Sequence, residues 1–147
     1  MLKYYSFNDK IKLLNDLIYT KLFYTKSRLI RRPFYVRGKK FIDFGYNLTT
    51  GVGCRIDAFS INNEICLKIG HDVQINDYVH IAAIKSVKIG NNVLIASKVF
   101  VTDHNHGYYG IENRHISPEV PPIKRELSFS PVSIEDDVWI GELVYKS

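Results

Sequence analysis

The sequence predicts a mainly β protein built from stacked, three-sided coils. Aliphatic residues recur every six positions, most are followed by a small or polar residue, and valine usually stands four positions later. The aliphatic positions are Ile69, Ile75, Ile81 and Val87, then after a two-residue shift Ile89, Ile95 and Val101, and later Ile134 and Ile140. A helix needs a period of 3.6 and an ordinary strand a period of 2, so neither explains this spacing.

A period of six has a simple structural cause. A short strand and a tight turn can repeat every six residues if one aliphatic side chain points inward each time, and three such units close a triangular coil. Small residues such as Gly70 and Gly90 let the chain turn each corner without a clash. Stacked coils then bury an aliphatic column that no single coil could bury. A weaker version of the pattern over Phe44–Asp57 predicts a first, irregular coil.

An amphipathic helix is expected before the coils. Its apolar residues recur at spacings of three and four: Ile11, Leu14, Ile18 and Leu22. This spacing predicts a helix over about residues 8–26, and Pro33 limits its extension. We expect residues 1–32 to form an N-terminal helical and basic segment and residues 33–147 to form the β domain.

Positive charge is concentrated around the end of this helix. The 147-residue chain carries a net charge of +5, and residues 21–40 hold eight Lys and Arg residues without an acidic residue. One interpretation is that the helix only caps the core; the other is that residues 21–40 also contact anionic lipid or a pyrophosphate-linked substrate. Nucleic acid is not expected, because the nearby aromatic residues form no stacking motif. The N-terminal residues contain no secretion signal or membrane span, so we expect a cytoplasmic protein that could work at the inner face of the membrane.

Two longer segments carry a family resemblance. "IGNNVLIASKVFVTDHNHGYYG" and "VSIEDDVWIG", separated by a proline-containing interruption, resemble the hexapeptide-repeat acyltransferases, most closely the O-acetyltransferases of O-antigen and lipopolysaccharide biosynthesis. The resemblance covers about residues 37–141. It implies a left-handed parallel β-helix and a homotrimer, in which a loop excursion over about residues 103–131 reaches a neighbouring subunit. It also implies acetyl-CoA as cosubstrate and a saccharide acceptor, whose linkage to a lipid stays open.

The resemblance assigns the catalytic role to His104. An imidazole that titrates near neutral pH can take the proton of a sugar hydroxyl as it attacks the acetyl thioester, so no covalent acyl-enzyme is required. His106 matches a less constrained position of the family. Without the resemblance, "TDHNHG" would be interpreted as a polar loop entrance that bonds its own backbone.

The other predicted site residues also come from the resemblance. Asn76 matches an asparagine that hydrogen-bonds the acceptor, and Trp139 with Gly141 is expected beside acetyl-CoA. Tyr108 and Tyr109 are candidates for stacking on a sugar ring. A turn asparagine, a packed tryptophan and tyrosines that anchor a loop remain alternatives.

Two other classes of function stay open. Related zinc-dependent carbonic anhydrases need three histidines that include a pair five positions apart, whereas His104, His106 and His115 lack this spacing, so no metal is expected. The second alternative is a non-catalytic trimeric scaffold. Relatives continue after "VWIG" through further coils, whereas this chain reads "ELVYKS". We therefore expect truncated C-terminal coils and an incomplete cofactor groove.

Overall fold

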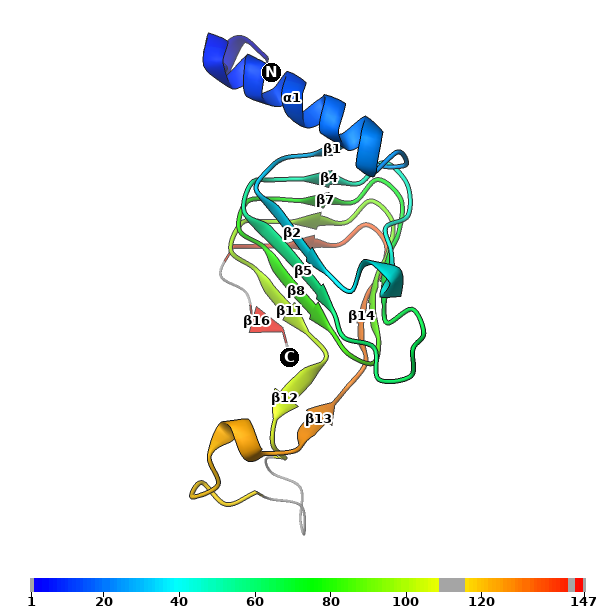
Figure 1. Cartoon of the computed structure of the whole chain (residues 1–147), viewed down its shortest axis with the longest axis vertical. Coiled ribbons are helices and arrows are strands. Elements are labelled where there is room, and N and C mark those ends of the chain that lie inside the picture. Colours follow the sequence, from blue (N-terminus) through cyan, green and yellow to red (C-terminus); the bar gives the residue numbers. More distant parts are fainter. Residues whose placement is uncertain (1, 109–115, 143–144, 147) are drawn as a thin grey trace.

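The computed structural model describes residues 2–108, 116–142 and 145–146. A helix at the N-terminal end precedes three parallel sheets, which form the sides of a triangular prism, and an antiparallel hairpin projects from it (Figure 1). Strands one coil apart pair in parallel, so the chain climbs the prism one coil at a time. The predicted fold class, a left-handed parallel β-helix with an N-terminal helix and a loop excursion, is confirmed.

Each side of the prism is one sheet. Sheet A contains β1 (Leu29–Ile30), β4 (Thr49–Thr50), β7 (Gln74–Ile75), β10 (Leu94–Ile95) and β15 (Trp139–Ile140). Sheet B contains β2 (Phe34–Arg37), β5 (Cys54–Ala58), β8 (His80–Ala83), β11 (Phe100–Thr102) and β16 (Tyr145–Lys146). Sheet C contains β3 (Ile42–Asp43), β6 (Leu67–Ile69), β9 (Val87–Ile89) and β14 (Val132–Ile134). The hairpin pairs β12 (His104–His106) with β13 (Leu127–Phe129), and the helical elements are η1 (Leu2–Tyr4), α1 (Phe7–Phe23), η2 (Lys39–Phe41) and η3 (Pro122–Lys124).

The aliphatic column predicted from the six-residue period forms the core. All nine predicted inward residues are buried, with at most 9% of any of them exposed. Ile75, Ile95 and Ile140 stack in register along sheet A, for example, each in a different coil. Adjacent coils thus bury one another's inner face, as the repeat predicted.

The first coil begins earlier than Phe44, where the sequence predicted it. Strands β1, β2 and β3 form a coil before that stretch and pair with β4, β5 and β6. Its inward residues also recur every six positions: Ile30, Val36, Ile42 and Leu48. The Arg and Lys residues that alternate with them point outward and conceal the period in the sequence.

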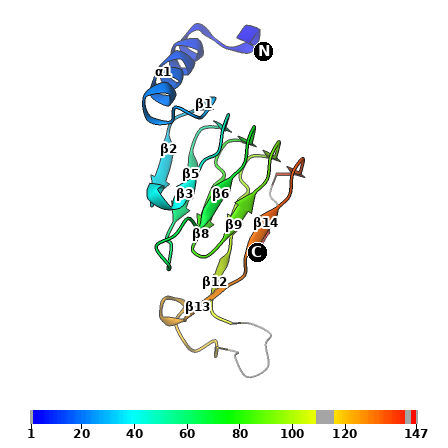
Figure 2. The same ribbon diagram turned by 90° about the vertical axis from the view of Figure 1, so that its right-hand side faces the viewer.

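The helix α1 lies across the first coil (Figures 1 and 2) and contacts it through polar side chains. The buried Thr20 hydroxyl accepts a hydrogen bond from the backbone N–H of Ile30 at 2.8 Å, and the buried Asp16 carboxylate accepts one from Arg32 Nε at 2.7 Å. Strand β1 is the edge of its sheet, and its unpaired backbone groups need polar partners. This requirement turns the polar half of α1 toward the coil.

The predicted apolar stripe of the helix therefore does not cap the core. Its four residues are exposed to solvent by 44% to 69% of their surface: Ile11, Leu14, Ile18 and Leu22. The helix does lie at the end of the prism and packs Tyr19 against the core, but its apolar stripe does not cover the aliphatic column.

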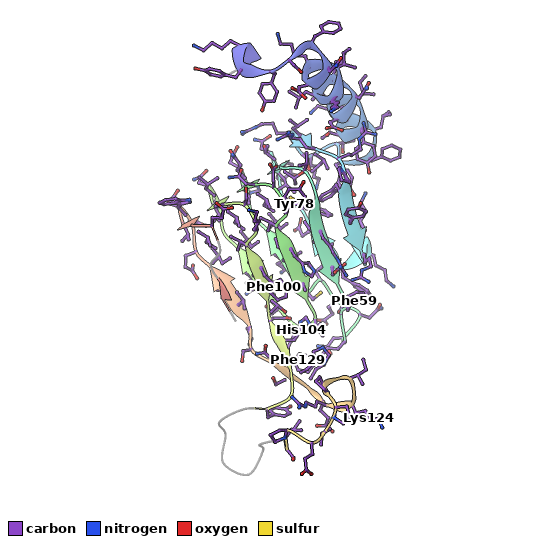
Figure 3. The ribbon with its side chains drawn as sticks, turned by 90° about the vertical axis from the view of Figure 1, so that its left-hand side faces the viewer. Phe59, Tyr78, Phe100, His104, Lys124 and Phe129 are labelled. Atoms are coloured by element: carbon purple, nitrogen blue, oxygen red, sulfur yellow. The ribbon has the colours of Figure 1, made fainter. Side chains whose placement is uncertain are left out.

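The loop excursion leaves the prism after β11 and returns at β14. Between these strands, His104 pairs with Phe129 at the base of the β12–β13 hairpin. The backbone N–H of Ser130 donates to the carbonyl of Asp103 at 2.9 Å, and Val132 N–H donates to Ser86 at 3.0 Å, so the two ends of the excursion close on the same corner. His104 is the first residue beyond this corner, which places its side chain where prism and hairpin meet (Figure 3).

Candidate active site

The imidazole of His104 is held through one of its two nitrogens. Nδ1 lies 2.8 Å from the hydroxyl oxygen of Thr102 and 3.2 Å from Oδ1 of Asp103. The side chain is 18% exposed, so it is anchored from the protein side and still reaches solvent. When Nδ1 carries the proton and donates it to the carboxylate, Nε2 has the lone pair of a base.

Asp103 is the site residue that sequence reasoning missed. Its side chain is fully buried, and its carboxylate accepts the backbone N–H groups of Ile84, Lys85 and Ser86 at 3.0, 2.7 and 2.7 Å. These residues form the corner that contains the two-residue shift of the repeat. Two signals could have identified Asp103: an acidic residue within an aliphatic strand pattern, and an irregular corner whose N–H groups need an acceptor.

The residues after His104 lie on the hairpin. His106 is exposed and pairs with Leu127, and Tyr108 is half-buried, with its carbonyl accepting the N–H of Ile116 at 3.3 Å. Tyr109 lies outside the described residues. Of the two tyrosines predicted to stack on a sugar ring, only Tyr108 is described, and it lies on the excursion.

Asn76, Trp139 and Gly141 lie at a different corner of the prism, between sheets A and B. The N–H of Asn76 donates to Ile95, and the N–H of Ala96 donates to Ile140, both at 2.9 Å. Asn76 and Gly141 therefore occupy the same corner, two coils apart. Trp139 is 72% exposed on the outer face of β15.

The predicted site residues consequently form two groups on one chain. The group around His104 follows the carboxyl ends of the sheet B strands, and the group around Asn76 precedes their amino ends. Figure 3 shows this separation, with Tyr78 near one end of the face and His104 near the other. A single chain does not bring the two groups together.

The two cysteines lie in the core and are both free thiols. Burial raises the pKa of the Cys54 thiol to about 11 and also raises the pKa of Cys66. Both thiols therefore stay protonated near neutral pH and are poor nucleophiles. Among the described residues, no group of three or more His, Cys, Asp or Glu side chains is arranged to hold a metal ion.

One comparison with known proteins identifies the family. The chain is 47% identical over 142 residues to the "Putative lipopolysaccharide biosynthesis O-acetyl transferase WbbJ" of Escherichia coli (strain K12). The alignment covers 97% of this chain and 71% of the relative. The chain belongs to this O-acetyltransferase family. The prediction of an acyltransferase from the family resemblance is confirmed.

Two other comparisons found no match. No protein-family profile matches the chain, and no solved structure matches it. In the part of the chain that the structure describes, α1 and the shorter helices lack the length and apolar character needed to cross a bilayer.

Proposed function

We propose that this O-acetyltransferase transfers the acetyl group of acetyl-CoA to a sugar hydroxyl of a surface polysaccharide or lipopolysaccharide precursor, in the cytoplasm. The observation that carries the proposal is the anchored imidazole of His104. Asp103 and Thr102 hold Nδ1, which leaves Nε2 as the nitrogen for substrate. The name of the relative, a lipopolysaccharide biosynthesis O-acetyl transferase, supports an acetyl donor and a saccharide acceptor.

The transfer is direct and takes place in a ternary complex. Nε2 of His104 removes the proton of the acceptor hydroxyl while the hydroxyl oxygen attacks the thioester carbonyl carbon. The resulting tetrahedral oxyanion is stabilised by hydrogen-bond donors such as backbone N–H groups. Collapse of this intermediate breaks the carbon–sulfur bond, and the imidazolium returns the proton to the CoA thiolate. The protonated state of Cys54 and Cys66 argues against an acyl-cysteine intermediate.

The complete site contains residues from two chains of a homotrimer. Asn76 and Gly141 stand at one edge of sheet B and His104 at the other, so an adjacent chain can supply the group that is remote within one chain. In this arrangement Trp139 and Gly141 of one chain border acetyl-CoA, while His104 of its neighbour faces the acceptor. The exposure of Trp139 on the outer face of β15 supports this assignment.

Subunit complementation tests both the function and the two-chain site. His104→Ala inactivates one group, and Asn76→Ala combined with Gly141→Leu inactivates the other. Each variant alone should release almost no thiol from acetyl-CoA with O-antigen saccharides as acceptors. If the two are dissociated, mixed in equal amounts and reassembled, about one quarter of the sites should combine two intact groups.

The matched control mixes His104→Ala with the variant that carries all three substitutions, and this mixture should stay inactive. Mixed trimers without recovered activity would contradict the two-chain site. Wild-type protein that binds saccharide but releases no thiol would support the scaffold alternative and contradict the proposed function.

A further inference from the structure

The outer half of α1 presents a continuous apolar stripe to solvent. The stripe consists of Phe7, Ile11, Leu14, Ile18 and Leu22. Their exposed fractions range from 44% to 77%. The spacing of four, three, four and four keeps these side chains on one side of the helix. Exposed apolar surface of this extent marks a surface for binding.

The charges of α1 are sorted between its two halves. Asp16 is buried against Arg32, and Asp9 bonds the helix-capping residue Ser6, so both carboxylates are engaged away from the stripe. Lys10 and Lys21 are exposed and stand three residues after Phe7 and Ile18, respectively, which places them beside the stripe. The outer half of the helix thus combines apolar side chains with positive charge.

Charge is also divided along the whole chain. The first 40 residues contain eleven Lys and Arg residues and two Asp residues, a net charge of +9. The remaining residues carry a net charge of −4. Asp57, Asp72 and Asp77 pair with arginines of the first 40 residues and offset three of these charges, so the end of the molecule that carries α1 keeps a net positive charge and complements an anionic surface.

The arginines of residues 21–40 do not supply the contact surface that the sequence suggested. They pair with aspartates of this chain: Arg28 with Asp72, Arg31 with Asp77, Arg32 with Asp16 and Arg37 with Asp57. Each of these guanidinium groups thus has a carboxylate partner within the fold. Lys10 and Lys21 of α1 form no ion pair among the described residues; Lys21 Nζ donates one hydrogen bond to the carbonyl of Ser27 at 3.4 Å, which leaves two of its N–H donors for a phosphate.

We propose that α1 docks the protein on an anionic lipid bilayer, with the stripe immersed at the level of the headgroups and Lys10 and Lys21 bonded to lipid phosphates. In-plane helices of this kind combine an apolar face with lysines whose long stems lie along it. A second copy of the chain is the weaker candidate for this face, because lysine is depleted from the centre of protein interfaces. Docking would bring the enzyme to a lipid-linked acceptor, a consequence that rests on the proposed function.

Vesicle flotation tests the proposal independently of acetyl transfer. Wild-type protein should float with vesicles of phosphatidylethanolamine and phosphatidylglycerol and more weakly with phosphatidylcholine alone. The triple variant Ile11→Ser, Leu14→Ser, Ile18→Ser should lose at least about tenfold in partitioning. The matched control replaces three exposed apolar residues far from the helix, Phe59→Ser, Ile61→Ser and Ile65→Ser, and should stay within about twofold of wild type.

A charge variant separates the electrostatic part of the contact. Lys10→Glu with Lys21→Glu should weaken flotation with the anionic vesicles, and this difference from wild type should shrink in high salt. Because all these side chains are exposed, the variants should keep the far-ultraviolet circular dichroism of wild type. Absence of wild-type flotation, or equal flotation of the stripe variant, would overturn the proposal. A change of oligomer mass in the stripe variant alone would assign the face to a second copy and would also overturn it.

Discussion

Two buried aspartates are each bonded to a histidine: Asp57 lies within β5, and Asp103 directly follows β11. The Asp57 carboxylate is 2% exposed and accepts hydrogen bonds from Arg37 Nε and Nη2 at 2.6 and 2.8 Å and from Arg55 Nε at 2.7 Å. Nε2 of His80 lies 3.0 Å from the same carboxylate, and the ring packs on Phe100 with 4.9 Å between centroids. His80 is thus bonded through the nitrogen that His104 presents outward.

The Asp103–His104 pair is built from different partners. Asp103 is satisfied by three backbone N–H groups and not by arginines, and it contacts Nδ1 of His104. Backbone amides neutralise little of the carboxylate charge, whereas two guanidinium groups at Asp57 more than balance it. The carboxylate charge beside His104 is therefore less compensated than the carboxylate charge beside His80. An Asp–His contact thus indicates catalysis only under two conditions. The other partners of the carboxylate must leave its negative charge uncompensated, and the ring nitrogen that does not contact the carboxylate must be accessible.

The largest expected effect separates the two histidines. His104→Ala should lower kcat by about 10²- to 10⁴-fold with little change in acetyl-CoA affinity, since a general base acts on the proton in the transition state. His80→Ala should leave kcat within about threefold of wild type and lower stability by about 1 kcal/mol, because it loses one hydrogen bond and one ring contact. Steady-state kinetics and urea unfolding of both variants measure this contrast. Equal losses of kcat would remove the distinction between the pairs.

An intermediate effect separates the two aspartates. Asp103→Asn replaces one of the two acceptor oxygens with an NH₂ group, so the side chain can no longer accept hydrogen bonds from all three backbone N–H groups. This change should reduce the free energy of unfolding by about 1–3 kcal/mol. It should also lower kcat about tenfold at unchanged KM, because His104 loses its ionic partner.

Asp57→Asn is the matched control for that change. It weakens the ion pairs with Arg37 and Arg55, which are half-exposed, so we expect a loss of about 1–2 kcal/mol of stability. Its kcat should match that of wild type when measured well below the unfolding temperature. A large kcat defect in Asp57→Asn with intact folding would show that the Asp57 cluster also serves the reaction.

The smallest effect concerns the side chain, other than the aspartate, that contacts each histidine ring. Thr102→Val removes the hydroxyl 2.8 Å from Nδ1 and should lower kcat about two- to fivefold, since Asp103 still orients the ring. Phe100→Leu removes the ring that packs on His80 and should change only stability, by about 0.5–1.5 kcal/mol. Parallel kinetics and thermal unfolding distinguish these outcomes. No kcat change in Thr102→Val would leave Asp103 as the sole partner that orients His104.

Some properties of this protein could be predicted from the sequence because they are local. The six-residue period depends on which side chain points inward within each short strand, so the inward residues from Ile69 to Ile140 could be assigned to the core from their spacing alone. The family resemblance rested on contiguous motifs, and it pointed to His104 because that residue lies within one of them. The period over Ile30–Leu48 was missed, since outward-facing Arg and Lys residues separate its inward positions.

Other properties depended on which coil lies beside which. The backbone N–H groups that donate to Asp103 precede it by 17 to 19 residues. Two partners of Asp57, Arg37 and His80, lie 20 residues before it and 23 after it, and neighbouring coils bring them into contact. The same holds for α1, whose apolar stripe faces solvent because the N–H of Ile30 in the edge strand β1 required an acceptor, which the Thr20 hydroxyl supplies.

The repeat, the core and the family thus follow from local sequence patterns. Three further features follow from contacts between distant segments: which backbone amides or arginines surround each buried carboxylate, which face of the helix is exposed, and the position of Asn76 and His104 at opposite edges of a sheet. No local pattern encodes them, because coil stacking and hydrogen-bond satisfaction involve residues far apart in the chain.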